Sequence, residues 1–116
     1  MEFTVAFYKK SDGSQPALEF INSLDAKMKA KVLRTIQLLQ LFGSELREPY
    51  SKPLGDGIFE LRAQVGNNIS RVLYFFIVDR RIILTNGFVK KTQKTPEPEI
   101  ALAKKYRNNY LNNEEV

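Results

Sequence analysis

The sequence contains no cysteine, no histidine and no tryptophan. Without cysteine, the chain can form no disulfide bond and offers no thiol nucleophile. Without histidine, it lacks the side chain that most often serves as a general base near neutral pH and as a metal ligand. No spacing typical of metal ligands is present either. We therefore expect no metal and no cofactor, and any catalysis must use other side chains.

Long apolar segments are also absent. No apolar run approaches the roughly 20 residues that a membrane-spanning helix needs. Residues 1–5 lack the basic region and long apolar run of a signal peptide. Walker loops, glycine-rich dinucleotide motifs and nucleophile elbows do not occur. We therefore expect a cytoplasmic protein that has no membrane partner.

Basic residues outnumber acidic ones. The 116 residues include 18 Lys and Arg against 13 Asp and Glu, which gives a formal charge of +5 and a pI near 9.5. The hydrophobic content of 43% is enough for one domain with a modest core over residues 1–116. A small basic domain suits an anionic partner, most often nucleic acid. A basic surface that is merely solvated explains the charge equally well.

The first part of the chain has the periodicity of one strand and two helices. Alternating apolar residues predict a strand over residues 2–8. Ser14 can cap a short helix whose first turn tolerates Pro16. A second helix is predicted from Asp25 to Gly43, since glycine favours a C-terminal cap.

The second part predicts a sheet and a final helix. Residues 44–52 read as a polar connection. Thr95 is expected to cap the last helix, with Tyr106 and Tyr110 facing the sheet. Between the polar connection and the last helix, apolar runs separated by turn residues predict three strands at residues 58–65, 69–78 and 81–89. The chain is thus predicted to be an α+β protein, in which two N-terminal helices and one C-terminal helix pack on a small, mainly antiparallel sheet.

Two arginines on the predicted strands can bind phosphate. Arg62 lies on the polar face of its strand, where its planar guanidinium can hold a phosphate through two hydrogen bonds. The alternative is a surface ion pair. Arg71 opens the next, nearly apolar strand, so we expect it where the sheet meets solvent. Its alternative role is to keep the sheet edge soluble.

A third group of cations lies between the last strand and the last helix. The like charges of Lys90, Lys91 and Lys94 repel one another, and a bound polyanion would relieve that repulsion. A solvated basic loop is the alternative. Phe88 can stack on a base or belong to the core.

The second helix is basic as well. Its cations lie largely off the apolar stripe and could contact nucleic acid, but a solvated helix face is the favoured interpretation. These residues are Lys27, Lys29, Lys31 and Arg34.

Three segments together resemble the RelE/HigB toxin superfamily, in particular its phage-derived HigB-like branch. They are KPLGDGIFELR at residues 52–62, RVLYFF at 71–76 and GFVKKTQKTP at 87–96. The resemblance implies a RelE-like fold and a type II toxin that cleaves mRNA in the ribosomal decoding site. It also implies a HigA-like antitoxin with a helix-turn-helix domain, through which alone the pair would bind operator DNA.

The resemblance also suggests roles for individual residues. The expected catalytic residues are Arg62, Arg71, Lys90 and Lys52. The expected RNA-binding residues are Lys91, Lys94 and Phe88. The same superfamily includes ParE-type toxins that act on DNA gyrase, so a fold alone does not decide the activity. A gyrase toxin and a non-enzymatic RNA-binding module are therefore the alternatives to a ribosome-dependent endoribonuclease.

Overall fold

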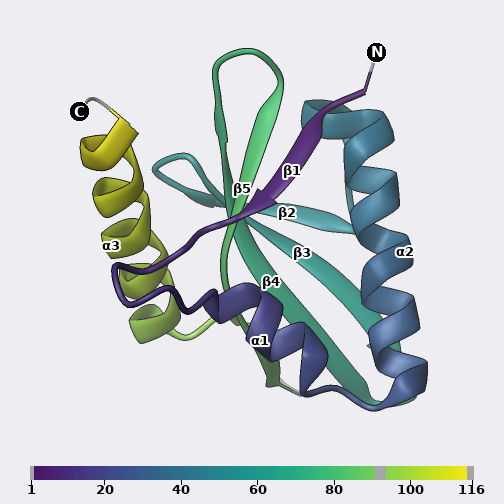
Figure 1. Cartoon of the computed structure of the whole chain (residues 1–116). Helices are drawn as coiled ribbons and strands as arrows, with labels where there is room; N and C mark the ends of the chain where they lie inside the picture. Colours follow the sequence, from purple (N-terminus) through teal and green to yellow (C-terminus); the bar gives the residue numbers. More distant parts are fainter. Residues whose placement is uncertain (1, 91–93, 115–116) are drawn as a thin grey trace.

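The computed structural model describes residues 2–90 and 94–114. Within these residues, five strands form one sheet in the order β1-β5-β4-β3-β2, and three α-helices pack on it (Figure 1). Every neighbouring pair is antiparallel except β1 and β5. The predicted α+β class with a mainly antiparallel sheet is confirmed. The elements are β1 (Thr4–Phe7), α1 (Pro16–Asn22), α2 (Ala26–Phe42), a 3-10 turn (Gly43–Glu45), β2 (Ser51–Gly55), β3 (Ile58–Val65), β4 (Asn68–Ile77), β5 (Arg81–Lys90) and α3 (Glu97–Glu114).

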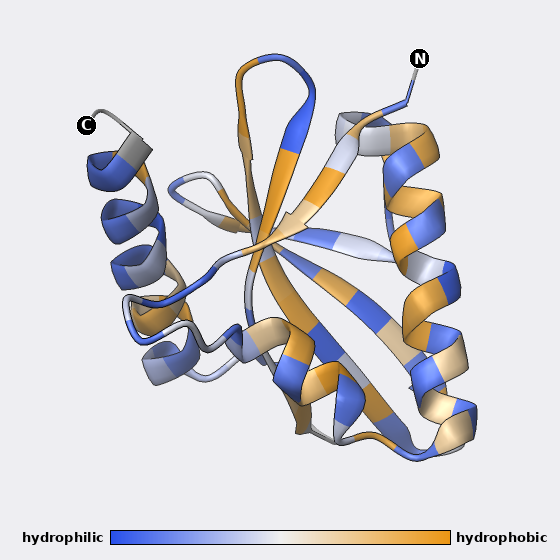
Figure 2. Ribbon diagram, viewed as in Figure 1, coloured by the Kyte–Doolittle hydropathy of each residue, from blue (hydrophilic) through white to orange (hydrophobic). Residues whose placement is uncertain are grey.

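Both faces of the sheet are covered by helices. One apolar cluster packs between the sheet and α1 and α2, and a second packs between the sheet and α3. The middle strand β4 contributes to both clusters, because Val72 and Tyr74 point to one side and Leu73 and Phe75 to the other. Figure 2 shows the hydrophobic residues along these central strands. The predicted burial of this strand on both faces is confirmed.

The long helix α2 follows its sequence signals closely. The Asp25 carboxylate accepts a hydrogen bond from the backbone N–H of Met28 at 2.8 Å, which caps the helix. The helix ends before Gly43, whose φ of +51° favours glycine. A Cβ atom there would also collide with the ring of Phe3. None of the described helices is both long and apolar enough to cross a bilayer.

The prediction of a polar connection over residues 44–52 is wrong at its C-terminal end. Residues Ser51–Gly55 form β2, which pairs with β3 so that Ser51 lies opposite Leu61 and Lys52 opposite Glu60. This strand has no alternating pattern, and its proline cannot donate a ladder hydrogen bond. An edge strand tolerates both features, because only one of its sides is paired. The other predicted strands are confirmed to within two residues.

Two predicted helix caps are also wrong. Helix α1 begins at Pro16 after Gln15, and the Ser14 hydroxyl instead donates to the carboxylate of Asp12 at 2.7 Å. Helix α3 begins at Glu97, two residues after Thr95. The hydroxyl of Thr95 points into the sheet rather than to the backbone of α3, since a buried carboxylate competes for it.

Candidate functional site

The two arginines predicted to bind phosphate lie directly opposite each other on neighbouring strands. In the register of β3 and β4, Arg62 pairs with Arg71. On the other side of β4, Arg71 pairs with Phe88 of β5, and Ile69 pairs with Lys90. Directly opposed residues share one face of a sheet. The side chains of Arg62, Arg71 and Phe88, from three strands, thus lie on the face of the sheet against which α3 packs.

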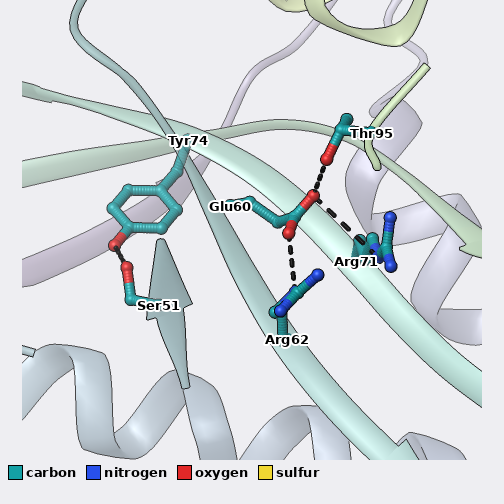
Figure 3. A network of polar contacts seen from close by, with 6 residues as sticks. All are labelled: Ser51, Glu60, Arg62, Arg71, Tyr74 and Thr95. Carbon is teal, nitrogen blue, oxygen red and sulfur yellow. Dashed lines mark hydrogen bonds and ion pairs between the residues drawn. The ribbon is translucent and has the colours of Figure 1, made fainter. Parts of the chain in front are cut away.

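A buried carboxylate lies between the arginines (Figure 3). Glu60 is 0% exposed, and its Oε2 atom lies 2.7 Å from Nε of Arg62. Its Oε1 atom lies 3.9 Å from Nε of Arg71 and accepts a hydrogen bond from the hydroxyl of Thr95. The acid therefore connects β3, β4 and the segment that leads into α3.

Glu60 and Thr95 were not predicted as site residues. The alternation of β3 does contain a signal for Glu60, because residues two apart on a strand share a face and Glu60 precedes Arg62 by two. No sequence signal indicates that Thr95 approaches this carboxylate from 35 residues away along the chain.

The prediction that Arg71 lies where the sheet meets solvent is wrong. Arg71 is 0% exposed, because β4 begins at Asn68 and is flanked by β3 and β5 at this level. Burial lowers the pKa of its guanidinium from the ordinary value, the carboxylate of Glu60 opposes that effect, and the charge of Arg62 adds to it. Arginine still remains protonated at any physiological pH.

The cluster of Glu60, Arg62 and Arg71 carries one positive charge in excess. Arg62 keeps a 13% exposed side chain, so an anion can reach the cluster from its side. Guanidinium groups bind phosphate oxygens through paired, charge-assisted hydrogen bonds. One phosphodiester has the charge that would neutralise this cluster, and the Glu60 carboxylate already lies against both guanidinium groups.

The structure brings two predicted lysines together at the edge of the sheet. Lys52 on β2 lies opposite Glu60 in the ladder. Lys52 and Lys94 line a common cavity of about 360 Å³, together with Thr95. Lys90 ends β5, but its side chain is not among those described, and Lys91 lies outside the described residues. The described cations therefore reach from β4 across β3 to the outer strand.

The aromatic residue on the sheet beside Arg71 and the two tyrosines of α3 pack in or against the apolar core. Phe88 is half-buried and packs against the apolar cluster beneath α3, while stacking on a base stays a prediction. Tyr106 stacks on Tyr8 with ring centroids 4.6 Å apart, and Tyr110 meets Phe75 edge to face. The prediction that Tyr106 and Tyr110 face the sheet is confirmed.

A larger cavity of about 670 Å³ opens on the opposite side of the sheet, between β2 and the loop after α2. At its floor the hydroxyls of Ser51 and Tyr74 lie 2.5 Å apart. Burial raises the pKa of the Tyr74 hydroxyl, although the hydrogen bond with Ser51 opposes the shift. Because the sheet separates these hydroxyls from Arg62 and Arg71, the two sites cannot act on one atom.

The chain matches a protein-family model. The family described as "Phage derived protein Gp49-like (DUF891)" aligns with residues 19–108. This span begins within α1, ends within α3 and leaves out only β1 among the described strands. This family is associated with RelE-like toxins. A search of curated proteins found no match.

Proposed function

Because the chain belongs to the phage-derived Gp49-like family, we propose that it is the toxin of a type II toxin–antitoxin system. In this proposal it is a HigB-like, ribosome-dependent endoribonuclease that cleaves mRNA. The observation that carries the proposal is the opposed pair Arg62 and Arg71, with the buried carboxylate of Glu60 against both and the side chain of Arg62 partly exposed.

The proposed reaction uses the RNA itself as the nucleophile. The 2′-hydroxyl attacks the adjacent phosphorus, the bond from phosphorus to the 5′-oxygen breaks, and the products are a 2′,3′-cyclic phosphate and a free 5′-hydroxyl. One proton leaves the 2′-oxygen and one is delivered to the departing 5′-oxygen. Arg62 and Arg71 would stabilise the charge that develops on the phosphate oxygens. The reaction needs no metal or cofactor.

Lysines are the proposed groups for proton transfer. Lys52 lies beside Glu60 across the ladder, and Lys90 follows Phe88 on β5. Either is a proposed acceptor of the proton from the 2′-oxygen. Lys91 and Lys94 would hold the RNA backbone. Correct orientation of the RNA can contribute about 7–11 kcal/mol toward lowering the barrier, and the ribosome would supply much of it.

The proposed partner is a HigA-like antitoxin. The toxin carries a net charge of +5, so an acidic contact segment on the antitoxin would speed association. The antitoxin's helix-turn-helix would read the operator in the major groove, and the toxin would bind that DNA only through it. A cytoplasmic location follows from the proposed ribosomal target.

Expression of the protein without a partner tests this proposal. Growth should stop, and primer extension should reveal new 5′ ends within translated mRNA, while an untranslated transcript stays intact. An Arg62→Ala variant is the matched control, and it should be soluble and should not cleave. Growth arrest with intact mRNA and damaged DNA would instead favour a toxin that acts on gyrase. If the protein neither cleaves mRNA nor damages DNA, the non-enzymatic RNA-binding module becomes the favoured function.

A further inference from the structure

The N-terminal half of α2 carries a row of cations. Lys27, Lys31 and Arg34 are spaced four and three residues apart, so they lie along one side of the helix over about 10 Å. Helix α2 contains no acidic residue. Among the described residues, none forms an ion pair with these three.

This arrangement does not favour the helix itself. Like charges four residues apart repel each other, and cations near the N-terminus oppose the helix dipole. Lys27 and Lys29 both lie in the first turns, where the N-cap carboxylate of Asp25 offsets only part of their charge. A bound anion would remove both penalties, whereas a merely solvated helix face would keep them.

Two adjoining cavities connect this row to the arginine cluster. One of about 280 Å³ is lined by Arg62, Tyr50, Gln64 and Lys31. The other, of about 440 Å³, is lined by Lys31, Gln64, Lys27 and Arg34. They lie side by side because they share Lys31 and Gln64. No carboxylate is among the described residues that line either cavity.

The edge of the sheet allows this connection. Strand β2 pairs with β3 only as far as Ser51 and Leu61, and the backbone N–H of Arg62 donates to the carbonyl of Tyr50 at 2.8 Å. Beyond that point, no described strand covers the outer side of β3. A chain bound at Arg62 can therefore pass around this edge to α2.

We infer that the surface formed by Lys27, Lys31, Arg34 and Tyr50 binds the single-stranded RNA that flanks the phosphate held at Arg62. The inference rests on the proposed function. Cations that track a backbone, combined with an aromatic ring, are typical of single-strand binding. Tyr50 is 41% exposed and lies between the two groups of cations, where a base can stack on it.

A protein partner fits this surface less well. The large apolar side chains that α2 exposes toward its end, Leu41 and Phe42, lie in the opposite half of the helix. The large apolar side chain that the basic half exposes is Leu33, which follows Val32 and precedes Arg34 and so points about 100° around the helix from the row of cations. The row itself therefore presents no apolar anchor of the kind that dominates protein interfaces.

The test compares two variants with the same loss of charge. In the first, Lys27, Lys31 and Arg34 are replaced by glutamine. The control carries Lys9→Gln, Lys10→Gln and Lys105→Gln, which lie elsewhere on the surface and are exposed. Binding is measured to 2′-O-methyl RNA, which cannot be cut through its 2′-oxygen, using oligonucleotides of about 4 and about 12 nucleotides.

The first variant should lose roughly tenfold in affinity for the long oligonucleotide and little for the short one. The slope of log affinity against log salt concentration should fall by about 2, since each phosphate contact on a single strand contributes about 0.7. The control should keep the affinity and the slope of the wild type for both lengths.

Several results would overturn the inference. These are equal losses for both lengths, equal losses in the control, or a wild-type affinity that does not depend on length. If the first variant keeps its affinity for the oligonucleotides but binds mRNA-free ribosomes more weakly, the surface contacts ribosomal RNA instead. Primer extension separates the two proposals. Wild-type protein that leaves mRNA intact defeats the proposed function, whereas cleavage with unchanged oligonucleotide binding by the first variant defeats only this inference.

Discussion

Replacing Glu60 by glutamine removes one negative charge from between two arginines and changes the shape of the side chain very little. In the wild type, Glu60 contacts Nε of Arg62 at 2.7 Å and Nε of Arg71 at 3.9 Å. The amide of glutamine can still accept a hydrogen bond from Thr95, so the packing stays the same. The electrostatic balance changes instead, because two opposed guanidinium groups then lose the carboxylate charge of Glu60 between them.

The structure sets the size of the expected effect. Removing one partner of a buried ion pair typically destabilises a protein by about 3–5 kcal/mol. Arg62 keeps partial contact with solvent at 13% exposure, so the lower end, about 3 kcal/mol, applies. For a chain of this size, that loss should lower the melting temperature by roughly 10 °C.

Inorganic phosphate should partly reverse this loss. If Arg62 and Arg71 form a phosphate site, Glu60 competes with an anion in the wild type, and Glu60→Gln removes the competitor. A ligand at 100 times its dissociation constant adds about 2.7 kcal/mol of stability. Urea unfolding with and without phosphate, at constant ionic strength, measures this difference. Glu2→Gln removes an exposed acid elsewhere and serves as the control.

Two results together would refute this reasoning. The first is a loss of stability below about 1 kcal/mol in Glu60→Gln, which is the size expected for an exposed ion pair. The second is an equal gain from phosphate in the wild type, in Glu60→Gln and in the control, which would indicate a general salt effect.

Three further predictions follow from single contacts. Arg62→Lys should cut mRNA less well than the wild type but bind RNA nearly as tightly, because lysine keeps the charge without the planar fork. Cleavage and binding are measured on one preparation, and equal losses of cleavage and of RNA affinity would contradict this prediction. Hydrogen bonding with Arg107, followed by the charges of Arg107 and a nearby lysine, lowers the pKa of Asp56. The stabilising contribution of Asp56 is therefore present above its unfolded-state pKa and is lost as the pH falls through the lower folded-state pKa. Asp56→Asn should reduce stability at neutral pH and match the wild type in acid. Urea unfolding at several pH values checks this, and a difference in stability that does not change with pH would argue against it. Gly87→Ala should cost about 1–3 kcal/mol, since the added Cβ would collide with the ring of Phe20; an unchanged melting temperature would show that α1 moves aside freely.

Apolar periodicity was sufficient to predict most of the fold. The predicted positions of β3, β4, β5 and α2 agree with the structure because each has a strong pattern, a cap or a turn signal. Asp79 and Arg80, for example, adopt φ values of +64° and +57°, as a tight hairpin turn requires. Strand β2 escaped prediction because its pairing with β3 determines its structure, and its own side chains do not alternate.

The candidate site was only partly predictable. Alternation within β3 correctly placed Arg62 on the polar face, since that inference is local. The burial of Arg71 depends on the strands that flank it, and no local pattern reports that. Likewise, the contact between Thr95 and Glu60 joins distant segments, so the preference of threonine for helix caps gave the wrong partner.

A reconstituted translation reaction tests the central claim most directly. Purified protein is added to ribosomes that are stalled on a defined mRNA, and the ends of the RNA are mapped and analysed chemically. The account predicts cleavage within the codon in the ribosomal A site, with a 2′,3′-cyclic phosphate on one product and a 5′-hydroxyl on the other. Cleavage should be much weaker with Arg62→Lys. Intact mRNA with active wild-type protein, or cleavage that Arg62→Ala leaves unchanged, would contradict it.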